Sequence, residues 1–257
     1  PWEPTEPSVH KSSSRSAPPI ASAAALMAPD MREVDAVIQR RLASDVAMIN
    51  QIAHYIVGAG GKRVRPMLVL LFSSALGFSG RERFELAATV EFIHTATLLH
   101  DDVVDESALR RGRQTANALF GNAASVLVGD FVYSRAFQMM VSVNRMRVLE
   151  VLADATNVIA EGEVLQLMNM HDPDLAVEDY LRVIRFKTAK LFEASARLGA
   201  VLAEANPGIE ESCAAYGRSL GTALGREFAL LLMSALDGAG LDRAGVMRAR
   251  VIGLERE

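Results

Sequence analysis

The sequence predicts an all-α fold, a single-domain antiparallel helix bundle around a central cavity, and three observations carry this prediction. Hydrophobic residues make up 50% of the 257 residues and aromatic residues only 6%, so aliphatic helix formers dominate the composition. Apolar residues recur at helical spacing, as at Val34, Val37, Ile38 and Leu42. The sequence also lacks alternating β-branched runs bounded by Asn-Gly, which would indicate hairpins.

The chain is expected to divide into a leader and one domain. Residues 1–29 are rich in Pro and Ser, so they are expected to form a flexible leader, or to precede a true start at Met27 or Met31. Residues 30–257 are expected to form the helical domain, with an altered sequence after residue 223. Helices are predicted at 30–57, 65–76, 82–106, 122–141, 146–170, 177–204 and 208–236.

Residues that start or interrupt helices support these bounds in order along the chain. Pro66 suits the first turn of the second helix, where a missing N–H costs nothing. Gly77 and Gly121 interrupt the periodicity before the third and fourth helices. Pro173 and Pro207 do the same before the sixth and the last.

Asp101, Asp102 and Asp105 place three carboxylates within five residues of an otherwise apolar segment. In a helix, Asp101 and Asp105 lie on one face, one turn apart, and His94 lies two turns before Asp101. Carboxylates this close repel one another, and a bound divalent cation removes that cost. Oxygen ligands that leave room for water and phosphate suit Mg²⁺. Seen alone, such a run is more often a solvated helix end.

Two groups of cationic residues flank the acidic run. Arg110 and Arg111 follow it directly, and Lys62 and Arg65 come after two glycines at a predicted helix start. Arginine forks onto oxyanions, and helix N-termini attract anions. Together with the acids, these residues predict a site for a metal-bound polyphosphate. The alternative for each group is an ordinary basic loop or helix start.

Two further polar pairs lie in later helices. Lys187 and Thr188 fall within a long amphipathic segment, whereas Glu163 and Gln166 stand three residues apart on an apolar helix. The first pair is compatible with ordinary helix surface. The second pair suits water or metal in a cavity, and equally a hydrogen bond between helices.

The ordered set of motifs resembles the trans-type (all-E) polyprenyl diphosphate synthase family over about residues 31–223. The stretch 91–115 looks most like the bacterial octaprenyl diphosphate synthase group. The matching pieces are Gly60-Gly61-Lys62-Arg63-Val64-Arg65-Pro66, Glu91-x-x-His94, Asp101-Asp102-x-x-Asp105, Arg110-Arg111-Gly112, Glu163-x-x-Gln166 and Lys187-Thr188. The resemblance implies a prenyltransferase that condenses isopentenyl diphosphate with an allylic diphosphate, such as farnesyl diphosphate. Its expected product is a long-chain all-E polyprenyl diphosphate for quinone side chains, as in ubiquinone biosynthesis.

The resemblance also implies roles for individual residues. Asp101 and Asp105, with Asp102 beside them, would bind Mg²⁺ that bridges to the allylic diphosphate, and Lys187 would join them in catalysis. The residues implied to bind substrate are Lys62, Arg65, His94 and Arg111 for isopentenyl diphosphate, Arg110, Lys187 and Thr188 for the allylic diphosphate, and Gln166.

Ala96 and Thr97 are implied to line the pocket that sets product length. In the family, bulky aromatic residues five and four positions before the acidic motif stop the growing chain early. Small residues at Ala96 and Thr97 therefore predict an open pocket and a long product.

The sequence departs from the family pattern after Ala223. The segment 216–223 begins the family's second aspartate-rich region, but no second Asp-Asp-x-x-Asp follows, and the nearby acids are Glu227, Asp237 and Asp242. Three explanations stay open: a frame disruption in the gene, the joining of pieces around omitted residues, or a divergent partner subunit. The missing motif predicts impaired catalysis or a regulatory subunit of a heteromeric synthase as the alternative function.

Two other functions are weighed against the synthase. A terpene cyclase would share the first acidic motif but would not need Lys62, Arg65 or His94. A helical scaffold would not need the ordered charges at all.

Charge and cysteine usage set the expected surroundings of the protein. The net charge of −4 gives no general attraction for nucleic acid. The single cysteine, Cys213, fits the cytoplasm. No transmembrane segment is expected, although a polyprenyl product would allow peripheral membrane association. The resemblance also implies a homodimer, in which the apolar segment 122–141 would pack against a copy of itself.

Overall fold

The computed structural model describes residues 20–58, 60–169 and 175–237, and this part of the chain is almost wholly helical. The helices are α1 (Ile20–Leu42), α2 (Ala47–Val57), α3 (Val64–Ala75), α4 (Glu82–Val104), α5 (Ala116–Phe120), α6 (Asn122–Ser142), α7 (Met146–Asn169), α8 (Val177–Val183), the π-helix η1 (Ile184–Ala189), α9 (Lys190–Leu202) and α10 (Pro207–Asp237). Two short strands, β1 (Leu109–Arg110) and β2 (Arg113–Gln114), pair antiparallel between α4 and α5. The prediction of an all-α, single-domain helix bundle is confirmed.

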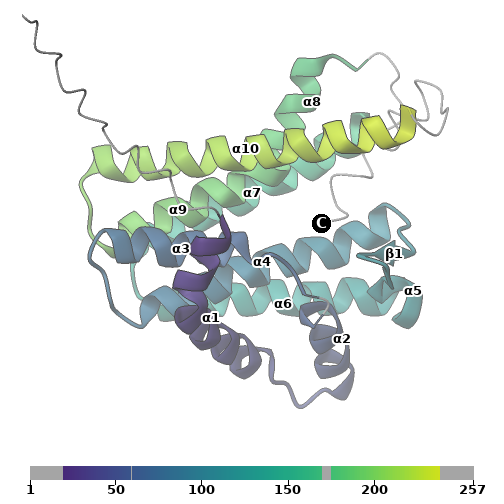
Figure 1. Cartoon of the computed structure of the whole chain (residues 1–257). Helices are drawn as coiled ribbons and strands as arrows, with labels where there is room; N and C mark the ends of the chain where they lie inside the picture. Colours follow the sequence, from purple (N-terminus) through teal and green to yellow (C-terminus); the bar gives the residue numbers. More distant parts are fainter. Residues whose placement is uncertain (1–19, 59, 170–174, 238–257) are drawn as a thin grey trace, which may run out of the picture.

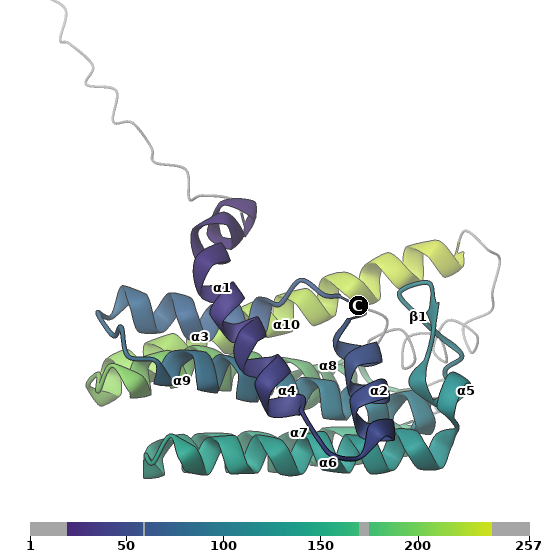
Figure 2. The same cartoon turned by 90° about the horizontal axis from the view of Figure 1, so that it is seen from below.

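Helix α4 lies at the centre of the bundle. It packs against α6, α3, α1 and α9, and α9 extends the packing to α10 and α7. In Figure 1, α10 crosses the top of the molecule above α7 and α9, and the hairpin and α5 lie together at one end. Figure 2 shows α6 along the outer edge of the bundle. The C-terminal end of α4, which carries the acidic motif, therefore lies close to the hairpin.

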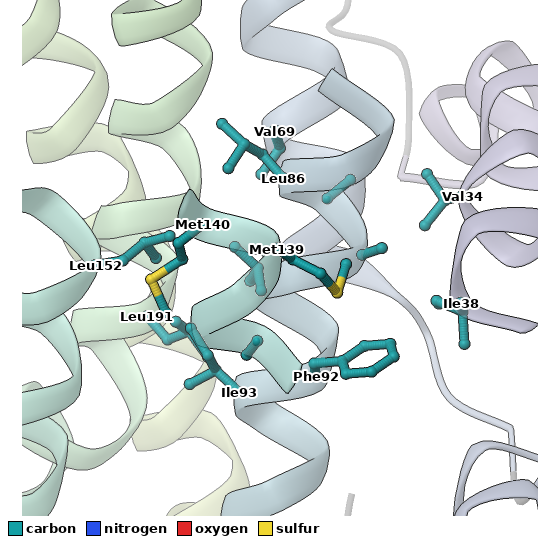
Figure 3. Packing of buried hydrophobic residues seen from close by; sticks show 14 of the residues in the cluster. Val34, Ile38, Val69, Leu86, Phe92, Ile93, Met139, Met140, Leu152 and Leu191 are labelled. Carbon is teal, nitrogen blue, oxygen red and sulfur yellow. The ribbon is translucent and has the colours of Figure 1, made fainter. Parts of the chain in front are cut away.

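Buried apolar side chains from several helices hold α4 in place (Figure 3). Met140 of α6 lies beside Leu152 of α7, and Phe92 of α4 lies on the side that faces Ile38 of α1. At most 2% of each of these side chains is exposed. Burying a side chain of this size stabilises a fold by about 1.5–3 kcal/mol. Helix α4 is thus a rigid platform for the polar residues at its end.

The first predicted helix is wrong in two respects. Helix α1 begins at Ile20, so residues 20–29 of the expected leader are helical, whereas residues 1–19 lie outside the described part. The single helix predicted at 30–57 is interrupted at 43–46. There the Ser44 N–H donates to Asn50 Oδ1 (3.0 Å), and Asn50 Nδ2 donates to the Ser44 carbonyl (2.6 Å). Such local side-chain bonds compete with the helix and separate α1 from α2.

The segment predicted as one helix at 177–204 is continuously helical but changes type in the middle. Residues Ile184–Ala189 form the π-helix η1, which contains Lys187 and Thr188. A π-turn shifts the register of the side chains that follow it, and such turns often occur at functional sites.

Within the described residues, no helix has both the length and the apolar character needed to cross a membrane.

Candidate active site

The acidic motif forms the last turn of α4. Asp101 and Asp102 are buried, and Asp105 caps the helix through its N–H, which donates to the Asp101 carbonyl at 2.8 Å. Asp101 and Asp105 are four residues apart, so their side chains lie on one face of this turn. Asp102 points to a different neighbour.

Asp102 pairs with Arg110 of the hairpin in a buried, forked contact. Arg110 donates to Asp102 Oδ1 from Nη2 at 2.8 Å and from Nε at 3.0 Å. The Asp102 side chain is fully buried, and only 6% of the Arg110 side chain is exposed. Asn117 Nδ2 also donates to the Asp102 carbonyl at 3.1 Å. The sequence grouped Asp102 with the metal-binding residues, whereas its carboxylate here fixes the direction of Arg110.

A two-residue turn presents the arginines. Arg110 and Arg113 are partners across the hairpin, so Arg111 and Gly112 form the turn, and both have positive φ angles (51° and 74°). This is the geometry of the tight turns that match the twist of paired strands. The Arg111 guanidinium lies against Gly61, where a Cβ atom would approach Nη1 to 3.0 Å. The turn therefore brings Arg111 onto the loop that carries Lys62.

The loop before α3 supplies further cations. Arg63 has a left-handed φ of 51°, and its Nη1 lies 3.0 Å from Glu91 Oε1. The Arg65 guanidinium lies 4.4 Å from the centre of the Phe192 ring. This is within the range of a cation–π contact. Lys62 is exposed.

His94 is a residue of α4, and the charges that act on it come from the start of α3 and from the hairpin. Burial lowers its pKa well below the usual value, and the positive charges of Arg65, Arg110 and Arg111 lower it further. The imidazole is therefore neutral near pH 7 and lies among guanidinium groups from two separate segments. Such a concentration of positive charge around a neutral side chain suits an anionic ligand.

Lys187 reaches the acidic motif from the opposite side of the bundle. Its Nζ lies 2.8 Å from Glu163 Oε2 and 3.5 Å from Asp101 Oδ2, and 8% of its side chain is exposed. The bundle was expected to place Asp101 opposite Lys187 across a central cavity, and the structure brings the two together in direct contact. Gly162 permits this approach, because a Cβ atom there would come within 2.8 Å of the Lys187 backbone nitrogen. Gln166 is buried one turn further along α7.

Burial changes the acidity of the two carboxyl groups around Lys187. It raises the pKa of Asp101, an effect that the Lys187 charge partly opposes. It also raises the pKa of Glu163, and the negative charge of Asp101 raises it further. Both shifts show that negative charge is costly here unless a cation balances it.

Several buried polar atoms of the site make no hydrogen bond to the described residues. They include Asp105 Oδ2, Arg110 Nη1 and Glu163 Oε1. An unsatisfied buried polar atom costs about 1–3 kcal/mol, so such atoms indicate where a ligand belongs. Among these atoms, Asp105 Oδ2 is an acceptor of the kind that suits a metal, and Arg110 Nη1 is a donor of the kind that suits an oxyanion.

The residues suit a divalent cation that shares its coordination with a ligand. In the part of the chain that the structure describes, no three His, Cys, Asp or Glu side chains converge as a metal site by themselves. Mg²⁺ commonly takes one or two carboxylates and completes its shell with water and substrate phosphate. Asp101 and Asp105, with the unsatisfied oxygen of Asp105, fit that pattern.

The two residues implied to set product length lie on α4 before the acidic motif. Ala96 is fully buried within the hydrophobic core. Thr97 is half-buried, and its hydroxyl donates to the His94 carbonyl at 2.8 Å.

Some sequence-predicted positions are not described, and some participants were missed. Asp242 lies outside the described residues, and the structure does not describe the side chains of Glu227 and Asp237. Arg63 belongs to the motif Gly60–Pro66 but was given no role, although its partner Glu91 belongs to the following motif, Glu91-x-x-His94. Asn117 carried no signal in the sequence, because its contact depends on the hairpin that brings α5 back to α4.

Comparisons with known proteins agree with this site. The sequence pattern of the polyprenyl synthetase family matches residues 46–224. The chain is 60% identical to the octaprenyl diphosphate synthase of Escherichia coli over 198 residues, which are 77% of this chain and 61% of that relative. The chain thus spans about three-fifths of the length of this curated relative.

Solved structures of polyprenyl synthases are also similar to this chain. A decaprenyl diphosphate synthase from Rhodobacter capsulatus has a TM-score of 0.78 and 46% identity, with 85% of this chain and 66% of that chain covered. A polyprenyl synthase from Caulobacter crescentus, complexed with calcium and isoprenyl diphosphate, has a TM-score of 0.80 with the same identity and coverage.

The family pattern extends over more than half of the chain and includes every site residue described above. The chain therefore belongs to the polyprenyl synthetase family.

Proposed function

We propose that this chain is a trans-polyprenyl diphosphate synthase that condenses isopentenyl diphosphate with an allylic diphosphate. The observation that carries the proposal is the convergence of Asp101, Arg110 and Lys187 from α4, the hairpin and η1. Buried cations next to a carboxylate pair suit a diphosphate bound together with a metal.

The allylic diphosphate is proposed to bind at the end of α4. Asp101 and Asp105 would hold Mg²⁺, which when bound neutralises charge on the diphosphate. Arg110, whose Nη1 is unsatisfied, would contact the diphosphate directly. Asp102 keeps that guanidinium in place rather than binding metal. Lys187 and Thr188 would cover the same diphosphate from η1, with Gln166 beside them.

Isopentenyl diphosphate is proposed to bind between the α3 loop and the hairpin. Lys62, Arg65, His94 and Arg111 would hold its diphosphate. The support is that the Arg111 guanidinium lies against Gly61 and that four arginines lower the pKa of His94. This second diphosphate site also separates the synthase from a terpene cyclase, which binds no isopentenyl diphosphate.

The proposed reaction begins when the allylic carbon–oxygen bond breaks and the diphosphate leaves with the electron pair. Arg110 and Lys187 stabilise the departing charge, because preorganised cations in a buried site need little rearrangement as charge develops. The double bond of isopentenyl diphosphate attacks the allylic carbocation, and loss of a proton restores a double bond. Apolar walls keep water from the carbocation.

A long product is part of the proposal. Ala96 and Thr97 are small, so they offer no aromatic barrier to a growing chain. The product is proposed to be a polyprenyl diphosphate of the length used for quinone side chains. A homodimer through α6 is proposed as the working assembly.

The test is a product assay on the chain as it stands. It uses Mg²⁺, farnesyl diphosphate and labelled isopentenyl diphosphate, and products are separated by length. We expect products longer than geranylgeranyl diphosphate. Asp101→Asn should lower turnover by about a hundredfold or more, because it removes a charge that acts on the reacting diphosphate.

Asp45→Ala is the matched control, since Asp45 is exposed between α1 and α2. It should retain full activity. Near-normal turnover of Asp101→Asn would reject the acidic motif as the metal site. A folded chain that binds diphosphate but forms no product would reject the activity and favour the impaired or regulatory subunit, which the lost second aspartate motif predicts.

A further inference from the structure

The Lys187 ammonium group lies between two carboxylates at unequal distances. Glu163 Oε2 is 2.8 Å away and Asp101 Oδ2 is 3.5 Å away, so Glu163 is the nearer counter-ion. Lys187 and Asp101 are both 8% exposed, and a buried ammonium group needs a nearby negative charge. The two carboxylates come from different helices, Glu163 from α7 and Asp101 from α4.

Asp101 cannot serve the metal and Lys187 equally. When a divalent cation takes the Asp101 carboxylate, that cation also repels the Lys187 ammonium group. Glu163 Oε2, the nearer of these two carboxylates, still lies 2.8 Å from the ammonium group. Without Glu163, the ammonium group would lose its nearer carboxylate while the bound cation repels it.

We propose that Glu163 is a positioning residue that holds the Lys187 ammonium group beside the diphosphate while Asp101 binds the metal. This inference rests on the proposed function and extends it, because Glu163 acts through Lys187 and touches neither substrate nor metal. Its role is to keep the cation of η1 in the orientation that the departing diphosphate needs.

The backbone around Glu163 and Lys187 brings α7 and η1 close together. Gly162, next to Glu163, lies directly under η1, where a Cβ atom would come within 2.8 Å of the Lys187 nitrogen and 2.9 Å of Phe186 Cβ. The π-turn and the glycine together set the distance between α7 and Lys187. The second oxygen of Glu163, Oε1, is buried without a hydrogen bond to the described residues.

The first test needs neither substrate nor metal. The rate at which an amine-acylating reagent labels Lys187 is measured by mass spectrometry. Glu163→Gln keeps the shape of the side chain but removes the charge, so Lys187 should label several-fold faster. Glu161→Gln is the matched control, because Glu161 is exposed on the same helix and accepts a hydrogen bond from Asn157. An unchanged rate in Glu163→Gln would overturn the proposal.

The second test uses inorganic diphosphate with Mg²⁺ and measures Kd by calorimetry. Simple electrostatics predicts tighter binding in Glu163→Gln, because a negative charge near the anion is lost. Positioning predicts the opposite: affinity should fall about tenfold, the effect of one misplaced charged hydrogen bond. In a Lys187→Gln background, Glu163→Gln should no longer weaken binding.

The outcomes separate this inference from the proposed function. Tighter binding in Glu163→Gln, or equal weakening with and without Lys187, would overturn the positioning role. A wild-type chain that binds no diphosphate would instead reject the proposed function. In that case the labelling rate still decides whether Glu163 holds Lys187.

Discussion

At the scale of single residues, the site is organised as pairs in which one side chain fixes the direction of another. Asp102 holds Arg110 through a forked contact, and Glu163 holds Lys187 at 2.8 Å. The acid in each pair comes from a long helix, and the cation comes from a more irregular element. Long helices thus orient the cations that are proposed to bind the ligand.

His94 provides a pH prediction at this scale. Its pKa is lowered by burial and by surrounding arginines, so it is neutral near pH 6.5 in the free protein. A bound diphosphate cancels part of that positive charge and raises the pKa of His94. Binding of isopentenyl diphosphate at pH 6.5 should therefore take up a fraction of a proton, at most about one.

Calorimetry in two buffers with different ionisation enthalpies measures the proton uptake. The His94→Gln variant should lose the proton uptake that is due to the histidine, whereas the proton uptake that is due to the ligand should remain. Equal uptake by both proteins would contradict the assignment of His94 to this diphosphate. The lowered pKa of His94 also affects the stability of the fold. Folding becomes less favourable as pH falls below about 6.5, because the histidine of the unfolded chain then takes up a proton that the buried, neutral histidine does not.

The residue types of the site could be predicted from the sequence, whereas their pairing could not. The motifs name Asp101, Asp102 and Asp105 together because they are adjacent in the chain. The structure separates them, because the hairpin brings Arg110 back onto Asp102. That return depends on the turn at Arg111 and Gly112, whose flanking residues lack the β-branched pattern that indicates strands.

At the scale of elements, long helices follow from apolar periodicity, and the irregular segments depend on local bonds. The break between α1 and α2 has no Gly or Pro. It depends on the reciprocal bonds of Ser44 and Asn50, which compete with helical hydrogen bonds. The π-turn of η1 packs against α7 and α10, and periodicity along one helix does not show such a turn.

Helix α10 packs closely enough on η1 and α9 for Gly221 to give a prediction. A Cβ atom at Gly221 would lie 2.7 Å from Ala189 Cα and 2.9 Å from Phe192 Cβ. Gly221→Val should therefore force α10 away and lower the free energy of unfolding by about 1–3 kcal/mol. For a chain of this size, each kcal/mol lowers Tm by about 2–4 °C.

Thermal unfolding followed by circular dichroism measures the change in Tm. Ala223→Val serves as the control, because Ala223 is exposed two residues further along the same helix. It should cost no more than about 0.7 kcal/mol, the range of ordinary helix propensities. Equal effects of the two substitutions would show that the close contact at Gly221 does not support η1.

At the scale of the whole molecule, one outer face remains apolar. Helix α6 lies along the edge of the bundle in Figure 2, and it exposes 68% of Leu127, 61% of Val141 and 40% of Phe137. These residues recur at spacings that place them on one side of the helix. Apolar side chains gathered on one face indicate a protein–protein contact, and a second copy of the chain fits such a face through two-fold symmetry.

The homodimer prediction is tested by placing a charge on this face, at its most exposed residue. Leu127→Glu should convert a dimer to a monomer, because two copies of the new carboxylate would be buried in a symmetric apolar contact. Light scattering coupled to size-exclusion chromatography gives the mass directly. Leu26→Glu is the matched control: Leu26 lies on α1 and is also 68% exposed, so the dimer should persist. If wild-type protein is monomeric at micromolar concentration, or if Leu127→Glu stays dimeric, this face of α6 is not the interface.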